Sequence, residues 1–91
     1  MTYVIRYDER VGEDVVHLDK SARILVQKAI ETKLQIQPEL FGKPLRHSLV
    51  GLRVLRVGAY RIVFVIKSQE VHVLLVGDRT YIYKEAEKRL R

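Results

Sequence analysis

Residues Leu52 to Lys67 have the sequence LRVLRVGAYRIVFVIK. On both sides of Gly58-Ala59 they are rich in Val, Leu and Ile and repeat with a period of two, which predicts two β-strands. The gap between the strands has the length of a two-residue hairpin turn, and Gly58 supplies the positive φ that such a turn needs at its first central position. This segment therefore predicts an antiparallel hairpin, around which the other elements are arranged.

The turn determines which side chains share a face of the hairpin. Val57 then faces Tyr60, and Arg56 lies directly across from Arg61. One face is bulky and apolar and suits packing against helices: Leu55, Val57, Tyr60, Ile62, Phe64 and Ile66. The other face carries the two arginines together with Leu52, Val54, Val63 and Val65.

The facing arginines predict an anion site. Like charges directly opposite on a sheet destabilise the pair, and a phosphate between them would relieve the repulsion because arginine binds phosphate bidentately. The alternative is that both guanidiniums turn into solvent, or that one of them pairs with Asp78 or Glu70, since exposed ion pairs are common and weak.

A third strand is predicted over residues 70–76, after the weaker turn Ser68-Gln69. Its register adds His72, Leu74 and Val76 to the face that carries the arginines. A sheet face open to water normally alternates with polar residues, and monomers rarely leave large apolar patches bare. The pattern therefore predicts that a partner, the curvature of the sheet or the tail helix covers this face.

The first half of the chain predicts one strand and two helices. Residues 2–7 alternate as a strand, and Asp8 is a candidate cap for a short helix that follows. Asp19 or Ser21 begins a second helix, which ends before Pro38. Its expected apolar positions are Ile24, Leu25, Ala29, Ile30, Leu34 and Ile36. Residues 38–51 are predicted as a loop, and residues 83–91 as a short charged helix or a frayed end.

The predicted architecture is α+β, in the order strand, two helices, three-stranded meander and short C-terminal helix. A small twisted antiparallel sheet with the helical hairpin on one face is the simplest way to bury both apolar patterns. The chain has 91 residues, which is enough for one core, so residues 1–91 are assigned to a single domain.

Composition limits the function. Seventeen Lys and Arg against eleven Asp and Glu give a net charge of +6, which favours an anionic partner. There is no cysteine and no long apolar run, so we expect a cytoplasmic protein without disulfides or a membrane segment. The three histidines are widely spaced and no nucleotide motif is present, so neither a metal nor a cofactor is predicted.

Three motifs carry a resemblance to a known family. The first is Arg56-Val57-Gly58-Ala59-Tyr60-Arg61, the second is Gly42-Lys43-Pro44-Leu45 leading to Gly51-Leu52, and the third is Val76-Gly77-Asp78-Arg79-Thr80-Tyr81-Ile82-Tyr83. With its size, element order and charge, the chain resembles the RelE/ParE toxins of type II toxin–antitoxin modules over nearly its whole length.

This resemblance implies a RelE-like fold and a ribosome-dependent endoribonuclease that cuts mRNA without a metal. In such enzymes the ribose 2′-hydroxyl attacks the adjacent phosphate, cations stabilise the transition state and an acid protonates the leaving 5′-oxygen. The implied partners are mRNA on the ribosome and an acidic or amphipathic antitoxin that wraps the sheet and displaces or covers the tail.

The resemblance also assigns residues. Arg61 is similar to the family's phosphate-binding arginine, Arg79 to the arginine after the last strand, and Tyr83 to the late tyrosine that stacks on a base or takes part in proton transfer. Arg56, Arg53 and Arg46 are expected to bind RNA, although the register puts Arg53 on the face toward the helices. His47, in the loop before the sheet, is the candidate proton acceptor, with His72 as the other imidazole of suitable pKa.

Two departures from the family keep other functions open. Many relatives have His where this chain has Asp78, and Leu55 stands where RelE-type enzymes have a lysine. Asp78 near arginines is expected to have a lowered pKa and to be a weak base. The alternatives are a ParE-type inhibitor of DNA gyrase without catalysis, and a weakly active RelE homologue that serves as an antitoxin-binding co-repressor.

Overall fold

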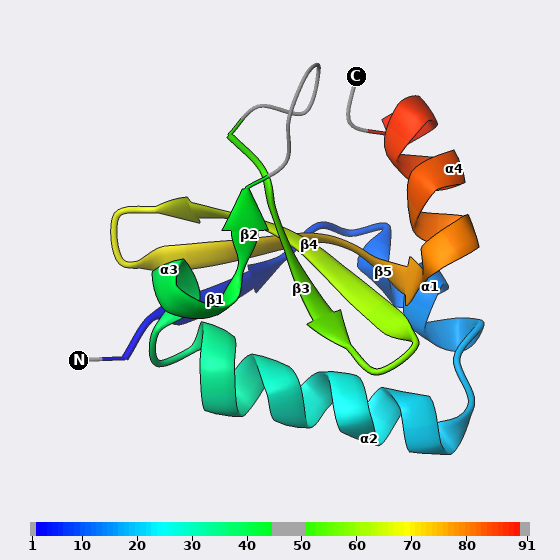
Figure 1. Cartoon of the computed structure of the whole chain (residues 1–91), viewed down its shortest axis with the longest axis horizontal. Helices are drawn as coiled ribbons and strands as arrows, with labels where there is room; N and C mark the ends of the chain where they lie inside the picture. The colour runs from blue at the N-terminus through cyan, green and yellow to red at the C-terminus, as the bar shows by residue number, and fades with distance from the viewer. Residues whose placement is uncertain (1, 45–50, 90–91) are drawn as a thin grey trace.

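The computed structural model describes residues 2–44 and 51–89. Its elements are β1 (Val4–Tyr7), α1 (Val11–Val16), α2 (Lys20–Ala29), the π-helical turn η1 (Ile30–Leu34), α3 (Pro38–Phe41), β2 (Lys43–Pro44), β3 (Arg53–Val57), β4 (Tyr60–Lys67), β5 (Glu70–Asp78) and α4 (Arg79–Arg89). The strands form one sheet in the order β1-β5-β4-β3-β2 (Figure 1). None of the described helices is long and apolar enough to cross a membrane.

The predicted α+β class, the element order and the helical hairpin on one face are confirmed. The pairs from β2 to β5 are antiparallel, but β1 adds to β5 in parallel, so the sheet is mixed rather than wholly antiparallel. A parallel pair needs a long connection, and the helices and the other strands between β1 and β5 supply one.

The β3–β4 hairpin has the predicted register. Val57 pairs with Tyr60, and Arg56 pairs with Arg61. Gly58 takes φ 60° at the turn, as the motif requires. At the second turn Ser68 takes φ 55°, which is uncommon for a residue with a side chain. The sequence signal for that turn is weak because glycine is missing from the position that needs it.

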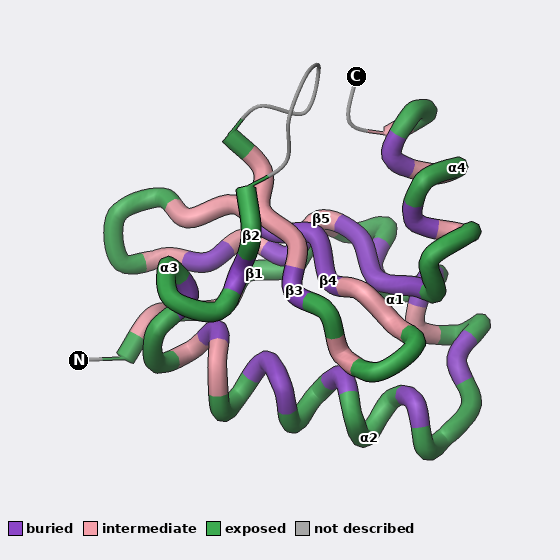
Figure 2. Tube along the Cα trace, in the orientation of Figure 1, coloured by how far each residue is buried: buried purple, intermediate pink, exposed green. Residues whose placement is uncertain are grey.

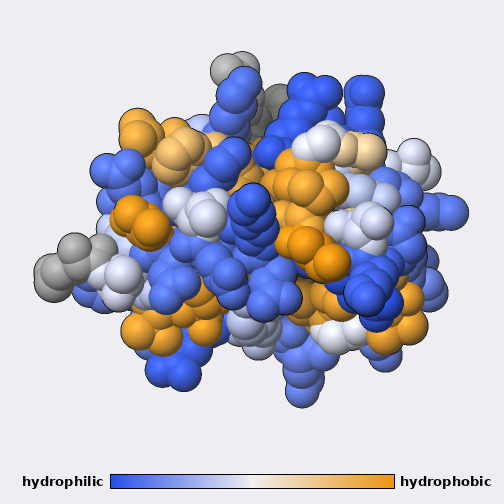
Figure 3. Space-filling model, turned by 90° about the horizontal axis from the view of Figure 1, so that it is seen from below, coloured by the Kyte–Doolittle hydropathy of each residue, from blue (hydrophilic) through white to orange (hydrophobic). Residues whose placement is uncertain are grey.

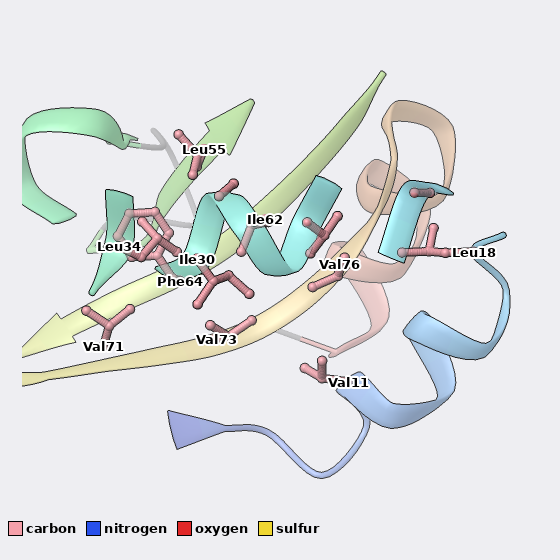
Figure 4. Close-up of a cluster of buried hydrophobic side chains, with 13 residues drawn as sticks. Val11, Leu18, Ile30, Leu34, Leu55, Ile62, Phe64, Val71, Val73 and Val76 are labelled. Carbon is pink, nitrogen blue, oxygen red and sulfur yellow. The ribbon is translucent and has the colours of Figure 1, made fainter. Parts of the chain in front are cut away.

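The main core lies between α2, η1 and the sheet face that carries Phe64 (Figures 2 and 4). Phe64, Ile62 and Leu34 are fully buried there. Asp19 begins α2, since its Oδ1 accepts the Ala22 amide at 2.8 Å.

Part of the expected apolar stripe of the second helix is wrong. The helix buries Ala22, Val26, Ala29, Ile30 and Leu34, whereas Ile24, Leu25 and Ile36 are exposed. Apolar residues occur on more than one side of α2, so helical spacing admits several stripes, and packing against the sheet selects the one with small residues at its start.

The opposite face of the sheet is covered by α4. Ile82 and Ala86 of this helix pack on Val63 and Leu75, so the tail helix supplies the cover that was one of the predicted alternatives. The apolar side chains around Val63 on this face are therefore covered without a partner protein.

The predicted register of the last strand is wrong beyond its middle. Val63 pairs with Leu75 but Phe64 pairs with Val73, so the pairing shifts at a β-bulge. Leu75 consequently belongs to the α4 side and Val76 to the main core. One extra residue in a strand exchanges the faces of all residues that follow it.

Residues 38–44 are also more ordered than the predicted loop. Pro38 opens α3 at its first turn, where a missing amide hydrogen costs nothing. Gly42 then passes so close to Phe64 that a Cβ would lie 2.3 Å from the ring, and the chain pairs with β3 as β2. The close approach explains why glycine stands between the two elements.

Candidate functional site

A row of three residues crosses the sheet on the face that carries α4. Arg56 of β3 pairs with Arg61 of β4, and Arg61 pairs with Gly77 of β5. Arg56 is exposed and Arg61 is half-buried. In the described part of the chain neither guanidinium has a hydrogen bond or an ion pair. The row therefore presents two unneutralised cations at adjacent positions.

The acids that might have neutralised the arginines are engaged elsewhere. Glu70 accepts from Nε2 of His72 at 2.9 Å and from Arg6 at 3.4 Å, and these contacts, His72 first, lower the pKa of Glu70. Asp78 Oδ1 accepts the Tyr81 amide at 2.8 Å and so caps the start of α4. Of the two alternatives to an anion site, the pairing of an arginine with Asp78 or Glu70 is therefore not found among the described residues, whereas the exposure of Arg56 fits the alternative of a guanidinium in solvent.

Arg79 and Tyr83, the other two residues assigned by the resemblance, both belong to α4. They lie four residues apart and so share one face of the helix, with the Arg79 guanidinium 5.9 Å from the centre of the Tyr83 ring. Tyr83 remains 58% exposed. Because α4 starts directly after β5, this cation and this exposed ring lie at the strand end that carries Gly77, the third residue of the row.

Gly77 and Tyr81, which the sequence analysis did not single out, fix the start of α4. A Cβ on Gly77 would lie 2.4 Å from Cδ2 of Tyr81, so only glycine lets the Tyr81 ring rest on the strand. The Tyr81 hydroxyl donates to Asp14 of α1 at 2.7 Å. The signal available in the sequence was a glycine at a strand end followed four residues later by an aromatic residue.

The remaining predicted site residues do not join this row. His47 and Arg46 lie outside the described residues. Arg53 faces the helix side, paired with Phe64, and its Nη2 donates to the carbonyls of Glu39 at 2.8 Å and Gly42 at 2.6 Å. This guanidinium therefore ties α3 and β2 to β3.

His72 lies on the same face as the row but apart from it. It pairs with Val65, four residues along β4 from Arg61, which is about 13 Å at the usual rise of a strand. Its Nε2 contacts Glu70. His72 therefore lies too far along the strand to share a phosphate with Arg61.

A groove of about 270 Å³ lies on the other side of the sheet. Figure 3, seen from the side of α2, shows hydrophobic areas between hydrophilic ones on this surface. The groove is lined by Tyr7, Val15, Leu18, Arg23, Val26, Gln27, Ile30 and Glu31. None of these residues comes from β3, β4 or α4, so the groove is separate from the arginine row.

In chemical terms the row is suited to binding phosphate. Arg56, Arg61 and Arg79 bring three cations from three different elements to one end of the sheet, and Tyr83 adds a ring on which a base can stack. The carboxylate nearest in sequence, Asp78, serves as a helix cap. The arrangement is thus stronger in charge stabilisation than in proton transfer.

The fold was compared with known proteins. A Mycobacterium tuberculosis toxin–antitoxin complex, RelBE2, has a chain with 28% identity and a TM-score of 0.82, and the match covers 87% of this chain and 100% of that one. A doubly substituted Escherichia coli toxin RelE, in complex with a peptide of antitoxin RelB, has 26% identity and a TM-score of 0.68, with 94% and 95% covered.

An archaeal RelE–RelB complex from Pyrococcus horikoshii shares the fold at 19% identity and a TM-score of 0.65, with 87% of this chain and 97% of that one covered. No protein-family model matches the sequence. No curated protein matches it either.

Proposed function

Because the chain belongs to the RelE-like toxin superfamily, we propose that its 91-residue domain is the toxin of a type II toxin–antitoxin module and cuts mRNA on the ribosome. The observation that carries this proposal is the facing pair Arg56 and Arg61, which keeps two adjacent guanidiniums without a counter-charge among the described residues. Such a pair destabilises the sheet, and a phosphate backbone is the ligand that would relieve the repulsion.

The proposed reaction is a transesterification. The ribose 2′-oxygen forms a bond to the adjacent phosphorus while the bond from phosphorus to the 5′-oxygen breaks, which leaves a 2′,3′-cyclic phosphate and a 5′-hydroxyl. Arg61 and Arg79 stabilise the charge that develops on the phosphoryl oxygens. Arg56, with Arg46, holds the backbone, and Tyr83 stacks on a neighbouring base.

Two protons have to move in this reaction. The 2′-hydroxyl loses one as it attacks, and the leaving 5′-oxygen gains one. His47 is the proposed acceptor because its intrinsic pKa suits the task, whereas Asp78 is occupied as a helix cap. His47→Gln with His72→Gln as its matched control tests this assignment, and we expect only the first to slow cleavage.

An acidic or amphipathic antitoxin is the proposed partner. Two of the similar structures above 25% identity are toxins in complex with an antitoxin or an antitoxin peptide, and the net charge of +6 makes an acidic partner complementary to this chain. An antitoxin that reaches the arginine row would block RNA by occupying the same cations.

The decisive experiment is mRNA cleavage in a translating extract. We expect Arg61→Ala and Arg79→Ala each to lower the cleavage rate about 10²- to 10³-fold, as removal of one transition-state donor does elsewhere. Arg6→Ala is the matched control, since Arg6 is an exposed arginine of the same sheet that pairs with Glu70. The proposal fails if the extract shows no cleavage and both substitutions leave growth inhibition unchanged.

One observation favours the ParE-type alternative. Asp78 and Leu55 replace the histidine and lysine that the resemblance implies for the enzyme, and Leu55 is buried in the core. A gyrase supercoiling assay at toxin excess separates the two functions, since inhibition there would favour the ParE type. A host that tolerates the chain without an antitoxin would instead indicate the co-repressor.

A further inference from the structure

Asp14 has an unusual environment for an acidic residue. It is buried, with 1% of its surface exposed. Its Oδ2 accepts the Val76 amide at 3.1 Å, and its Oδ1 accepts the Tyr81 hydroxyl at 2.7 Å. Arg89 donates to both oxygens, from Nη1 at 2.9 Å and from Nη2 at 3.0 Å. One carboxylate thus joins α1, β5 and both ends of α4.

Arg89 is enclosed as well. Its side chain is 5% exposed, and it also donates to the Leu74 carbonyl at 3.3 Å and to Glu85 at 3.1 Å. A bidentate pair between arginine and carboxylate is directional, because two parallel N–H groups have to meet two oxygens. The pair therefore fixes the last turn of α4 in orientation as well as in distance.

Stability alone does not account for this pair. Taking two charges out of water costs about as much as their attraction returns, and apolar residues of similar volume often serve a fold equally well. Apolar contact along α4 is limited, since just Ile82 and Ala86 are buried there. A helix with so little apolar contact needs another means of fixing its position.

The position of α4 matters because it carries half of the proposed site. Tyr81 lies between Arg79 and Tyr83 in the sequence, and its ring rests on Gly77, the strand partner of Arg61. Whatever fixes Tyr81 therefore also fixes Arg79 and Tyr83 relative to Arg61.

We propose that Asp14 is a positioning residue, which holds α4 through Tyr81 and Arg89 so that Arg79 and Tyr83 meet the phosphate bound by Arg61. This inference rests on the proposed function. Asp14 itself touches no substrate in this scheme. Its effect should thus appear in the turnover of bound RNA and leave RNA binding to the sheet unchanged.

The test compares Asp14→Asn and Tyr81→Phe with two controls. Tyr3→Phe removes a tyrosine hydroxyl that donates to Glu39 at 2.6 Å, far from α4 in the sequence, and Glu70→Gln removes an exposed carboxylate of β5. We expect Asp14→Asn to lower kcat for mRNA cleavage on the order of 100-fold, a loss that misplacement of a reacting group by about 1 Å can cause. RNA affinity should fall by no more than the loss of the one base stacked on Tyr83 accounts for, and both controls should cleave at the wild-type rate.

Background substitutions separate positioning from general damage to the fold. In a variant that already lacks both α4 groups (Arg79→Ala with Tyr83→Ala), Asp14→Asn should cause no further loss. In an Arg61→Ala background, the full loss should persist. Equal losses in both backgrounds would overturn the inference. Should Asp14→Asn not fold, Tyr81→Phe is used in the same comparison, since it leaves the pair of Asp14 with Arg89 in place.

Hydrogen exchange of the α4 amides tests the hold of Asp14 on α4 without any measurement of RNA cleavage, so the two proposals can fail separately. If the wild-type chain cuts no RNA, the proposed function fails, and the hold of Asp14 on α4 is then judged from the amides of α4. Faster exchange in α4 of Asp14→Asn, with β4 and β5 unchanged, supports it. Unchanged exchange in α4, or equal acceleration throughout the sheet, overturns it. If the wild type does cleave and Asp14→Asn keeps its kcat, the positioning role alone fails.

Discussion

Replacing Arg56 with glutamate should make the protein more stable and less able to bind RNA. Arg56 pairs directly with Arg61 across β3 and β4, and neither has a counter-charge among the described residues. Arg56→Glu turns a repulsive pair into an attractive one at the same position. Stability and function should therefore change in opposite directions.

The size of the effect follows from the pairing. An opposite-charge pair directly across a sheet contributes about 0.2–1 kcal/mol relative to two alanines, and a like-charge pair is destabilising. Arg56 is exposed, and solvent weakens its interactions. We therefore expect a gain of about 0.5–1 kcal/mol in the free energy of unfolding. For a domain of this size the gain corresponds to a rise of about 2–8 °C in Tm.

The assay is thermal unfolding at two salt concentrations together with RNA titration. The gain in Tm should shrink at 1 M salt, where the screening length is about 3 Å. Loss of one phosphate contact should also reduce the slope of log K against log salt by about 0.7 for single-stranded RNA. Arg23→Glu on the exposed side of α2 is the control, because it changes the net charge equally.

Two results would refute this reasoning. If Arg56→Glu and Arg23→Glu change Tm equally, the facing pair has no special repulsion. If RNA affinity and its salt slope survive Arg56→Glu, the row does not bind the backbone.

Two further predictions concern the backbone and pH. Gly77→Ala should lower the free energy of unfolding by about 1–3 kcal/mol, because the new Cβ would lie 2.4 Å from the Tyr81 ring, and it should slow RNA cleavage. Gly12→Ala meets nothing within 4 Å and should raise the free energy of unfolding by about 0.5–1 kcal/mol. Chemical denaturation and the cleavage assay check both substitutions. The side-chain hydrogen bond from Arg10 lowers the pKa of Asp8 from 3.8 to about 2. The contribution of this ion pair to stability is therefore present above about pH 4 and is lost as the pH falls toward 2. The stability difference between the wild type and Asp8→Asn should vanish over that range in acid unfolding curves. A difference independent of pH would contradict this.

The arginine pair could be predicted because hairpin register is local. Gly58 sets the turn, and the period of two then places Arg56 opposite Arg61. The same logic failed one strand later, because the bulge between Val63 and Phe64 changes the pairing with β5. A bulge depends on the partner strand and on what packs over it, and neither is encoded within a few residues.

Burial on α2 shows a similar limit. Helical spacing places Ile24 and Leu25 on an apolar side as reasonably as Val26, and the sheet buries only Val26. Arg53 has the charge and the position in the sequence that suit RNA binding, yet its guanidinium donates hydrogen bonds to the carbonyls of Glu39 and Gly42. Only the folded backbone brings those carbonyls within reach.

By itself the sequence determined the strand and helix pattern, the α+β class and the facing arginines, because each depends on neighbours a few positions apart. The tertiary structure decided the parallel edge strand β1 and the cover of the second face by α4. It also decided the contacts of Asp14 with Val76, Tyr81 and Arg89, which are 62, 67 and 75 positions away in the chain. Local periodicity carries no information about such distances, and only the packing of α1 and α4 against β5 brings these groups together.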